Sequence, residues 1–108
     1  MVCDDRGSFR SLEASGHAGF AGRGHDIVCA AETCILRTAL QVLEQTEGIL
    51  LNKNDASRGT LAFSVEVKSS SQLLEERLKC TADFIRAGIK GLAEEYPEHV
   101  LLREKKEN

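Results

Sequence analysis

Residues 16–31 read Gly-His-Ala-Gly-Phe-Ala-Gly-Arg-Gly-His-Asp-Ile-Val-Cys-Ala-Ala, and the rest of the chain is organised around this stretch. The stretch holds two of the three histidines, one of the four cysteines and four of the nine glycines in the chain. An apolar run with helical spacing begins at Ile27, directly after the glycines. A loop, a helix start and the densest group of reactive side chains are therefore expected to meet here.

The glycines predict a loop from Gly16 to His25, because each costs about 1 kcal/mol relative to alanine in a helix interior. Asp26 is then the expected N-cap, since its carboxylate can accept a hydrogen bond from the first helical turn. Behind it, apolar residues at helical spacing predict a helix from Ile27 to about Gly48. The loop is either a plain connection or a cover beside a reactive site. Its glycines are Gly16, Gly19, Gly22 and Gly24.

Turn residues and periodicity predict the remaining elements on either side of this stretch. In chain order they are a hairpin in Val2–Ser15 with its turn near Asp5–Gly7, a polar turn at Asn52–Gly59, a strand at Thr60–Val67, a helix from about Ser70 to Tyr96 ended by Pro97, a short strand at His99–Arg103 and a solvated tail at Glu104–Asn108. The order is ββ-α-β-α-β. It predicts an α+β fold in which two helices pack on a mainly antiparallel sheet.

Length and composition favour one small cytoplasmic domain spanning residues 1–108. The net charge of −3 and the single tyrosine argue against direct nucleic-acid binding. No apolar run approaches the ~20 residues of a membrane span. The four cysteines form no Cys-x-x-Cys pair, and no signal peptide is evident, so we expect reduced thiols. A chain of this size buries only roughly 60–70% of its unfolded surface, and dimerisation would bury more.

Cys29 is the candidate nucleophile. If Asp26 is the N-cap, Cys29 occupies the third helical position, where the helix dipole favours the reactive thiolate. A nearby imidazole could take the thiol proton, and both His17 and His25 are available. Spacing alone leaves open which histidine reaches the sulfur. The spacing is also compatible with purely structural roles, in which Cys29 is an ordinary buried residue, His25 packs in the loop and Asp26 only caps the helix.

Two other site chemistries are weaker alternatives. His17, His25, Asp26 and Cys29 are all competent zinc ligands, but no pair shows the usual spacing of a zinc site. Glycines before a helix can also cradle a phosphate. However, Gly22-Arg23-Gly24 lacks the Gly-Lys-Ser/Thr ending of a P-loop. We therefore expect neither a metal nor another cofactor.

The strings Gly16-His17-Ala18 and Gly24-His25-Asp26-Ile27-Val28-Cys29-Ala30 resemble the ribosomal-processing cysteine protease family (Prp). The twelve-residue step from His17 to Cys29 is similar too. The resemblance implies a cysteine endopeptidase with Cys29 as nucleophile, His17 as base, and His25 and Asp26 in supporting roles. It also implies a glycine loop that covers the site, and a homodimer.

The substrate that the resemblance implies is a bacterial large-subunit ribosomal protein that carries a short N-terminal extension. Backbone N–H groups at the start of the helix, including that of Cys29 or its neighbours, are the expected oxyanion donors. The competing hypothesis is a non-catalytic, ribosome-associated binding protein with the same fold. Selective reactivity of Cys29 would separate the two hypotheses.

Overall fold

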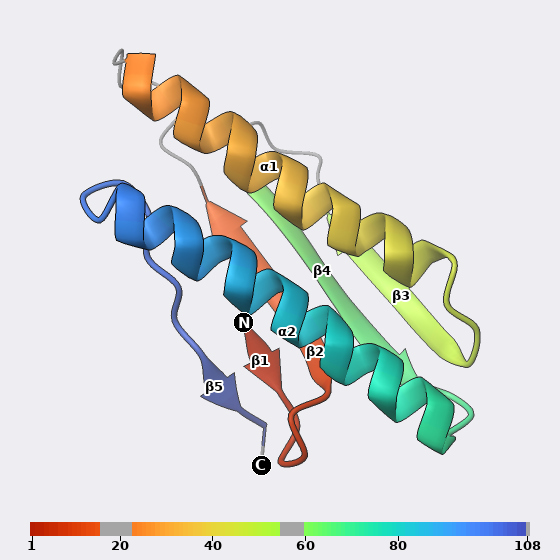
Figure 1. Cartoon of the computed structure of the whole chain (residues 1–108). Coiled ribbons are helices and arrows are strands. Elements are labelled where there is room, and N and C mark those ends of the chain that lie inside the picture. The colour runs from red at the N-terminus through yellow and green to blue at the C-terminus, as the bar shows by residue number, and fades with distance from the viewer. Residues whose placement is uncertain (16–22, 55–59, 108) are drawn as a thin grey trace.

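The computed structural model describes residues 1–15, 23–54 and 60–107, and for residues 23–26 it describes the backbone alone. Two antiparallel helices, α1 (Arg23–Glu44) and α2 (Gln72–Glu95), lie side by side on one face of a five-stranded sheet (Figure 1). The strands are β1 (Val2–Cys3), β2 (Phe9–Ser15), β3 (Ile49–Asn54), β4 (Thr60–Val67) and β5 (Lys105–Lys106). Their order in the sheet is β3-β4-β2-β1-β5, and only β1 and β5 run parallel. The predicted α+β class, with two helices on a mainly antiparallel sheet, is confirmed.

Strand β3 corrects the predicted element order to ββ-α-ββ-α-β. Residues Asn52 to Asn54 do not form the start of a polar turn but pair with β4, where Asn52 lies opposite Ser64. An edge strand with one face uncovered tolerates such polar residues. Lys53 lies on the helix-facing side, and there its ammonium is 3.7 Å from the carboxylate of Glu44 at the end of α1.

The C-terminal strand also lies later than predicted. Residues 99–103 form no strand, and β5 falls within the stretch predicted to be a solvated tail. The backbone N–H of His99 and that of Val100 both donate to the carbonyl of Tyr96, which turns the chain after α2. Pairing with β1 begins only where the N–H of Lys105 donates to the carbonyl of Met1. The charged side chains of β5 are exposed, as is usual on an edge strand.

Helix α1 begins and ends about four residues earlier than predicted. Its first residue is Arg23 rather than Ile27, so Gly24 lies in the helix. A glycine is tolerated there because adding residues to an existing helix is far easier than nucleating one. The helix ends at Glu44, where the Thr46 hydroxyl donates to the carbonyl of Val42. Gly48, with φ of +86°, makes the turn into β3.

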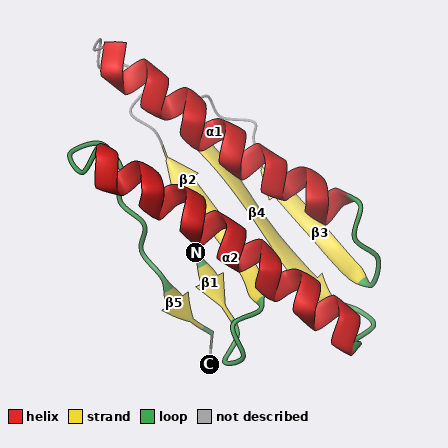
Figure 2. Ribbon diagram, viewed as in Figure 1, coloured by secondary structure: helices red, strands yellow, loops and turns green. Residues whose placement is uncertain are grey.

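The core lies between the sheet and the two helices (Figure 2). The predicted alternation of β4 is confirmed, because Leu61, Phe63 and Val65 are buried on the helix-facing side. Phe63 stacks at a tilt on Phe9 of β2, with ring centroids 5.5 Å apart. Helix α2 turns one apolar stripe towards the sheet, and Leu92 near its end is only partly buried. The buried ones are Leu74, Leu78, Ala82, Ile85 and Ile89.

Ser71 caps α2, close to the predicted start of this helix at about Ser70. Its side chain accepts a hydrogen bond of 3.1 Å from the backbone N–H of Leu74. Ser71→Ala leaves that N–H without its partner, so we expect a loss of about 1 kcal/mol in the free energy of unfolding. Urea denaturation at neutral pH measures it. Ser70→Ala is the matched control, and an equal loss in both variants would contradict this role for the Ser71 hydroxyl.

The ion pair between Arg86 and Glu104 makes stability depend on pH. A hydrogen bond of 2.8 Å from Arg86 is the main cause that lowers the pKa of Glu104, and partial burial opposes it only in part. Because the pKa of Glu104 is lower in the folded than in the unfolded protein, its ionised carboxylate stabilises the fold at pH values above the unfolded-state pKa of about 4.3. This stabilisation is lost as the pH falls through the folded-state pKa.

We therefore expect Glu104→Gln to reduce stability at pH 7 but to weaken the fall in stability between about pH 5 and pH 3. Urea denaturation of both proteins at several pH values in this range tests the prediction. Parallel pH profiles for the wild type and Glu104→Gln would show that the Glu104 carboxylate does not contribute.

Candidate active site

The predicted site residues that the structure describes lie at one end of the sheet. Strand β2 ends there at Ser15, which pairs with Thr60 at the start of β4. The first turns of α1 and the last turn of α2 lie at this same end (Figure 1). His17 follows Ser15 by two residues, and Cys29 lies in the second turn of α1. The end of β2 and the helix that carries Cys29 therefore lie at the same end of the domain, whereas His17 itself lies outside the described residues.

Cys29 lies deeper in its helix than predicted, and Asp26 is not the N-cap. With Arg23 as the first residue, Asp26 is inside α1 and Cys29 is its seventh residue. The helix dipole acts mainly within the first turn, so it favours a Cys29 thiolate less than we expected. The backbone N–H of Cys29 is also committed to the helical bond with the residue four positions earlier. Within α1, the N–H groups without helical acceptors are those of residues 23–25, because the N-cap carbonyl accepts the N–H of residue 26.

Cys29 lies on the sheet-facing side of α1. Leu36, seven residues later and so on the same stripe, is 3% exposed, and the neighbouring Val28 is 1% exposed. Cys29 itself is half-buried. It therefore lies where the buried stripe of α1 gives way to the end of the domain, which suits a nucleophile that a substrate must reach.

Glu32 is a candidate that the sequence analysis missed. It follows Cys29 by three residues, so the two positions are neighbours on α1, and it is half-buried. The positions four residues before and after it are occupied by the buried Val28 and Leu36. An acidic residue within an apolar stripe is unusual, and this pattern could have identified Glu32 from the sequence. A carboxylate there can stabilise positive charge on an imidazolium near Cys29.

The other three cysteines are poor candidates. Cys3 is 6% exposed, and burial is the main cause that raises the pKa of its thiol, which therefore stays protonated. Cys34 is exposed on α1 but lies about 140° around the helix from Cys29 at about 100° per residue. Cys80 is exposed on α2. Of the four thiols, Cys29 alone combines partial burial with a position at the end of the sheet where the histidines are expected.

Several predicted site residues lie outside the described part of the chain. His17, Gly16, Gly19 and Gly22 belong to residues 16–22, so the dyad and the glycine cover remain predictions. Gly24 lies in α1 rather than in a loop, and so do His25 and Asp26. The backbone places His25 one turn before Cys29, at the i to i+4 spacing that puts two positions on one helix face.

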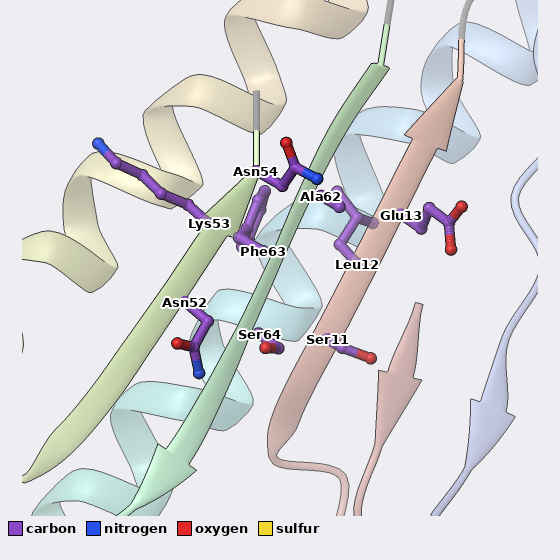
Figure 3. Close-up of a pocket in the computed structure, with 9 residues that line it drawn as sticks. All are labelled: Ser11, Leu12, Glu13, Asn52, Lys53, Asn54, Ala62, Phe63 and Ser64. Atoms are coloured by element: carbon purple, nitrogen blue, oxygen red, sulfur yellow. The ribbon is translucent and has the colours of Figure 1, made fainter. Parts of the chain in front are cut away.

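A shallow hollow of about 270 Å³ lies on the other face of the sheet, away from the helices (Figure 3). It crosses β3, β4 and β2, where the side chains of Asn52, Ser64 and Ser11 form one row across the strands. Neither a cysteine nor a histidine lines it. The sheet separates it from α1, so this hollow is not the place where Cys29 would act.

Metal and membrane chemistry find no support in the part of the chain that the structure describes. Within residues 1–15, 23–54 and 60–107, no three His, Cys, Asp or Glu side chains are grouped closely enough to hold a metal ion. The zinc alternative rests mainly on side chains outside the described set. Neither described helix is both long and apolar enough to span a bilayer.

Comparison with known proteins decides the family. The family model for the cysteine protease Prp matches residues 1–101. The chain belongs to the Prp cysteine protease family. It is therefore a cysteine protease by family, as the resemblance implied. No curated protein matches the sequence significantly.

Solved structures share the fold. SMU.848 from Streptococcus mutans is 25% identical with a TM-score of 0.75, covering 98% of this chain and 90% of that one. An essential ribosomal processing protease Prp from S. aureus, in complex with a substrate peptide, is 21% identical with a TM-score of 0.74. The same protease with a covalently linked product peptide is 23% identical with a TM-score of 0.69. In both comparisons 96% of this chain and 94% of the other are covered.

Proposed function

We propose that this chain is a cysteine endopeptidase that removes a short N-terminal extension from a bacterial large-subunit ribosomal protein. The observation that carries the proposal is the position of Cys29, half-buried at the end of the sheet where β2 ends at Ser15. The family match over residues 1–101 supports the protease chemistry. The likeness to a ribosomal processing protease that was solved with a substrate peptide supports the choice of substrate.

In the proposed mechanism Cys29 and His17 act as a dyad. His17 takes the thiol proton, and the thiolate attacks the scissile carbonyl carbon to form a tetrahedral oxyanion. His17 then gives the proton to the leaving amine, which leaves a thioester on Cys29. Water hydrolyses the thioester and frees the thiol. No cofactor is needed.

The oxyanion donors must be other than the backbone N–H of Cys29. That group is engaged in the helix, whereas the N–H groups of residues 23–25 have no helical acceptor. His25 therefore contributes a backbone position of the right kind, beside the supporting roles that the resemblance implies for His25 and Asp26. We propose that the segment containing Gly16, Gly19 and Gly22 covers the site and opens for an extended peptide.

The proposal extends to the setting of the reaction. We place the protein in the cytoplasm as a homodimer whose partner is the ribosomal protein precursor. The net charge of −3 supports docking on a basic ribosomal protein rather than directly on nucleic acid.

The test is to incubate the purified protein with the precursor of its host's ribosomal protein and to measure product masses. A single N-terminal cut by the wild type, absent with Cys29→Ala, is the expected result. Alkylation of the four thiols at a pH where ordinary thiols are mostly protonated is measured alongside, with fastest labelling expected at Cys29.

Two outcomes would overturn parts of the proposal. Without a cut but with selective labelling of Cys29, the protease mechanism stands and the substrate is wrong. Without a cut or selective labelling, the catalytic proposal fails and a non-catalytic, ribosome-associated binding protein is favoured.

A further inference from the structure

The hollow on the uncovered face of the sheet lies across β3, β4 and β2, away from the helix that carries Cys29 (Figure 3). Six of its lining residues share the outward side of these strands, because residues paired directly across a sheet point to the same face. They form two adjoining rows, which together we call the sheet hollow. The first row is Asn52, Ser64 and Ser11, and the second row is Asn54, Ala62 and Glu13.

The residues of the sheet hollow are not those that a strand favours. Valine, isoleucine, threonine and aromatic residues are enriched in strands, whereas asparagine and alanine are depleted. The helix-facing side of β4 follows this preference with Phe63 and Val65, but its outward side carries Ala62. Strand β3 likewise places Asn52 and Asn54 outward. Positions that depart from local preference in this way are expected to serve a function.

The charge on this face is negative at the border formed by β2. Glu13 is exposed there, and Figure 3 shows its carboxylate beside β2. Lys53 also lines the hollow, but its ammonium lies 3.7 Å from the carboxylate of Glu44 on the helix side. Leu12 and Phe63 are buried on that side as well. Among the described lining residues, Glu13 therefore supplies the charged group on the outward face.

The hydrogen-bonding groups of the sheet hollow suit a cation. The Glu13 carboxylate accepts hydrogen bonds, and the hydroxyls of Ser11 and Ser64 and the amide oxygens of the two asparagines add further acceptors. Lysine and arginine side chains bring donors alone. A cationic side chain therefore matches this face in charge and in hydrogen bonding, as in other charge-assisted pairs.

The size of the sheet hollow indicates what kind of partner fits. Its volume is about 270 Å³, and it is shallow. Sites for small molecules usually measure about 300–1,000 Å³ and enclose most of the ligand. A shallow hollow below this range is suited to a single side chain that a larger partner inserts.

The sheet hollow begins close to the end of the sheet where Cys29 lies. Ser15 and Thr60 form the last pair of β2 and β4 at that end. The next outward pair is Glu13 and Ala62, about 7 Å along the strands. The first turns of α1 lie at the same end (Figure 1). About six residues of extended chain span roughly 20 Å, so one peptide can pass around this end and reach both places.

We propose that the sheet hollow is a second docking site for the substrate, which binds a lysine or arginine side chain of the ribosomal protein precursor downstream of the cut. The inference rests on the proposed function and names where the retained, basic part of that protein is held. Because the sheet hollow does not touch the scissile bond, it contributes to affinity for the precursor, and its loss raises KM with little change in kcat.

Binding of the full precursor to the full-length Cys29→Ala protein, measured by isothermal titration calorimetry, tests the proposal without cleavage. Adding Glu13→Lys replaces an attractive contact by a like-charge one, so Kd is expected to rise at least about tenfold. Glu66→Lys is the matched control, because it makes the same charge change on the outward side of β4 but outside the sheet hollow. Its Kd should stay within about threefold of the parent protein.

Ser64→Tyr is a second variant, which fills the sheet hollow without changing its charge. An aromatic residue suits a strand, so the fold should be kept, and circular dichroism checks it. In the Cys29→Ala protein, Kd for the precursor is expected to rise at least about fivefold. In the protein with Cys29 intact, Ser64→Tyr should raise KM for the precursor and leave cleavage of a peptide that ends two residues past the cut unchanged.

Each outcome decides a distinct part of the inference. If the Cys29→Ala protein binds the precursor no more tightly than that short peptide, the sheet hollow is overturned and the protease is unaffected. Equal losses in Glu13→Lys and Glu66→Lys overturn it too, because they show a general charge effect. If Glu13→Lys instead alters only the sedimentation of the chain by itself, a second copy covers this face and the docking site is wrong. Precursor binding that depends on the sheet hollow, without cleavage by the wild type, upholds the docking site while the catalytic proposal fails.

Discussion

Cys29→Ser is expected to lower kcat/KM for cleavage of the precursor by at least about a thousandfold. A serine hydroxyl has a far higher pKa than a thiol, and an imidazole suited to a thiolate cannot activate it equally well. Cys29 is half-buried on the sheet-facing stripe of α1, so the isosteric change should leave packing and fold nearly unaltered. The loss is therefore expected in kcat, with little change in circular dichroism or thermal stability.

Cys34→Ser is the matched control, because it makes the same change on the same helix. Cys34 is exposed and faces a different side of α1, so its replacement should keep kcat/KM within about twofold of the wild type. Single-turnover cleavage of a peptide that spans the processing site measures both variants. Loss of activity in Cys34→Ser, with activity retained in Cys29→Ser, would falsify the assignment of the nucleophile.

The elements whose apolar pattern has one clear period could be predicted from the sequence. Strand β4 alternates because one of its faces is buried, and α2 presents an apolar residue to the sheet at each turn. Strand β3 could not be found in this way. It lies at the sheet edge, so its polar residues Asn52 and Asn54 contact solvent, and they resemble a turn in sequence. Strand β5 consists of two lysines, and only its backbone pairing with β1 defines it.

For the site, the sequence indicated which types of residue are present but not where each one lies in the helix. The glycine-rich stretch and its spacing to Cys29 were sufficient to identify the family, whereas Cys29 as nucleophile stays a prediction. The helix start was wrong because an aspartate after glycines is typical of an N-cap, whereas the helix extends back through Gly24 to Arg23. Glu32 was missed because one carboxylate within an apolar stripe becomes visible only once its neighbours Val28 and Leu36 are known to be buried.

Phe63→Ala is expected to cost about 3–5 kcal/mol of the free energy of unfolding. Phe63 is 2% exposed, and its ring lies against that of Phe9, which is fully buried. The deleted ring leaves a cavity between sheet and helices and removes an aromatic contact worth about 0.5–1.5 kcal/mol beyond its area. Because small domains have only about 5–15 kcal/mol in total, this one change would bring the fold near its limit.

Urea denaturation at a fixed protein concentration measures this loss, since dissociation of a dimer would add a concentration-dependent term. Leu101→Ala is the control. Leu101 is 74% exposed, so its truncation should change the free energy of unfolding by no more than about 0.5 kcal/mol. A loss below about 1.5 kcal/mol for Phe63→Ala would mean that the Phe9–Phe63 pair is not central to the core. The full loss would show that the packing of these two rings, one on each of the paired strands β2 and β4, is a main source of the stability of the domain.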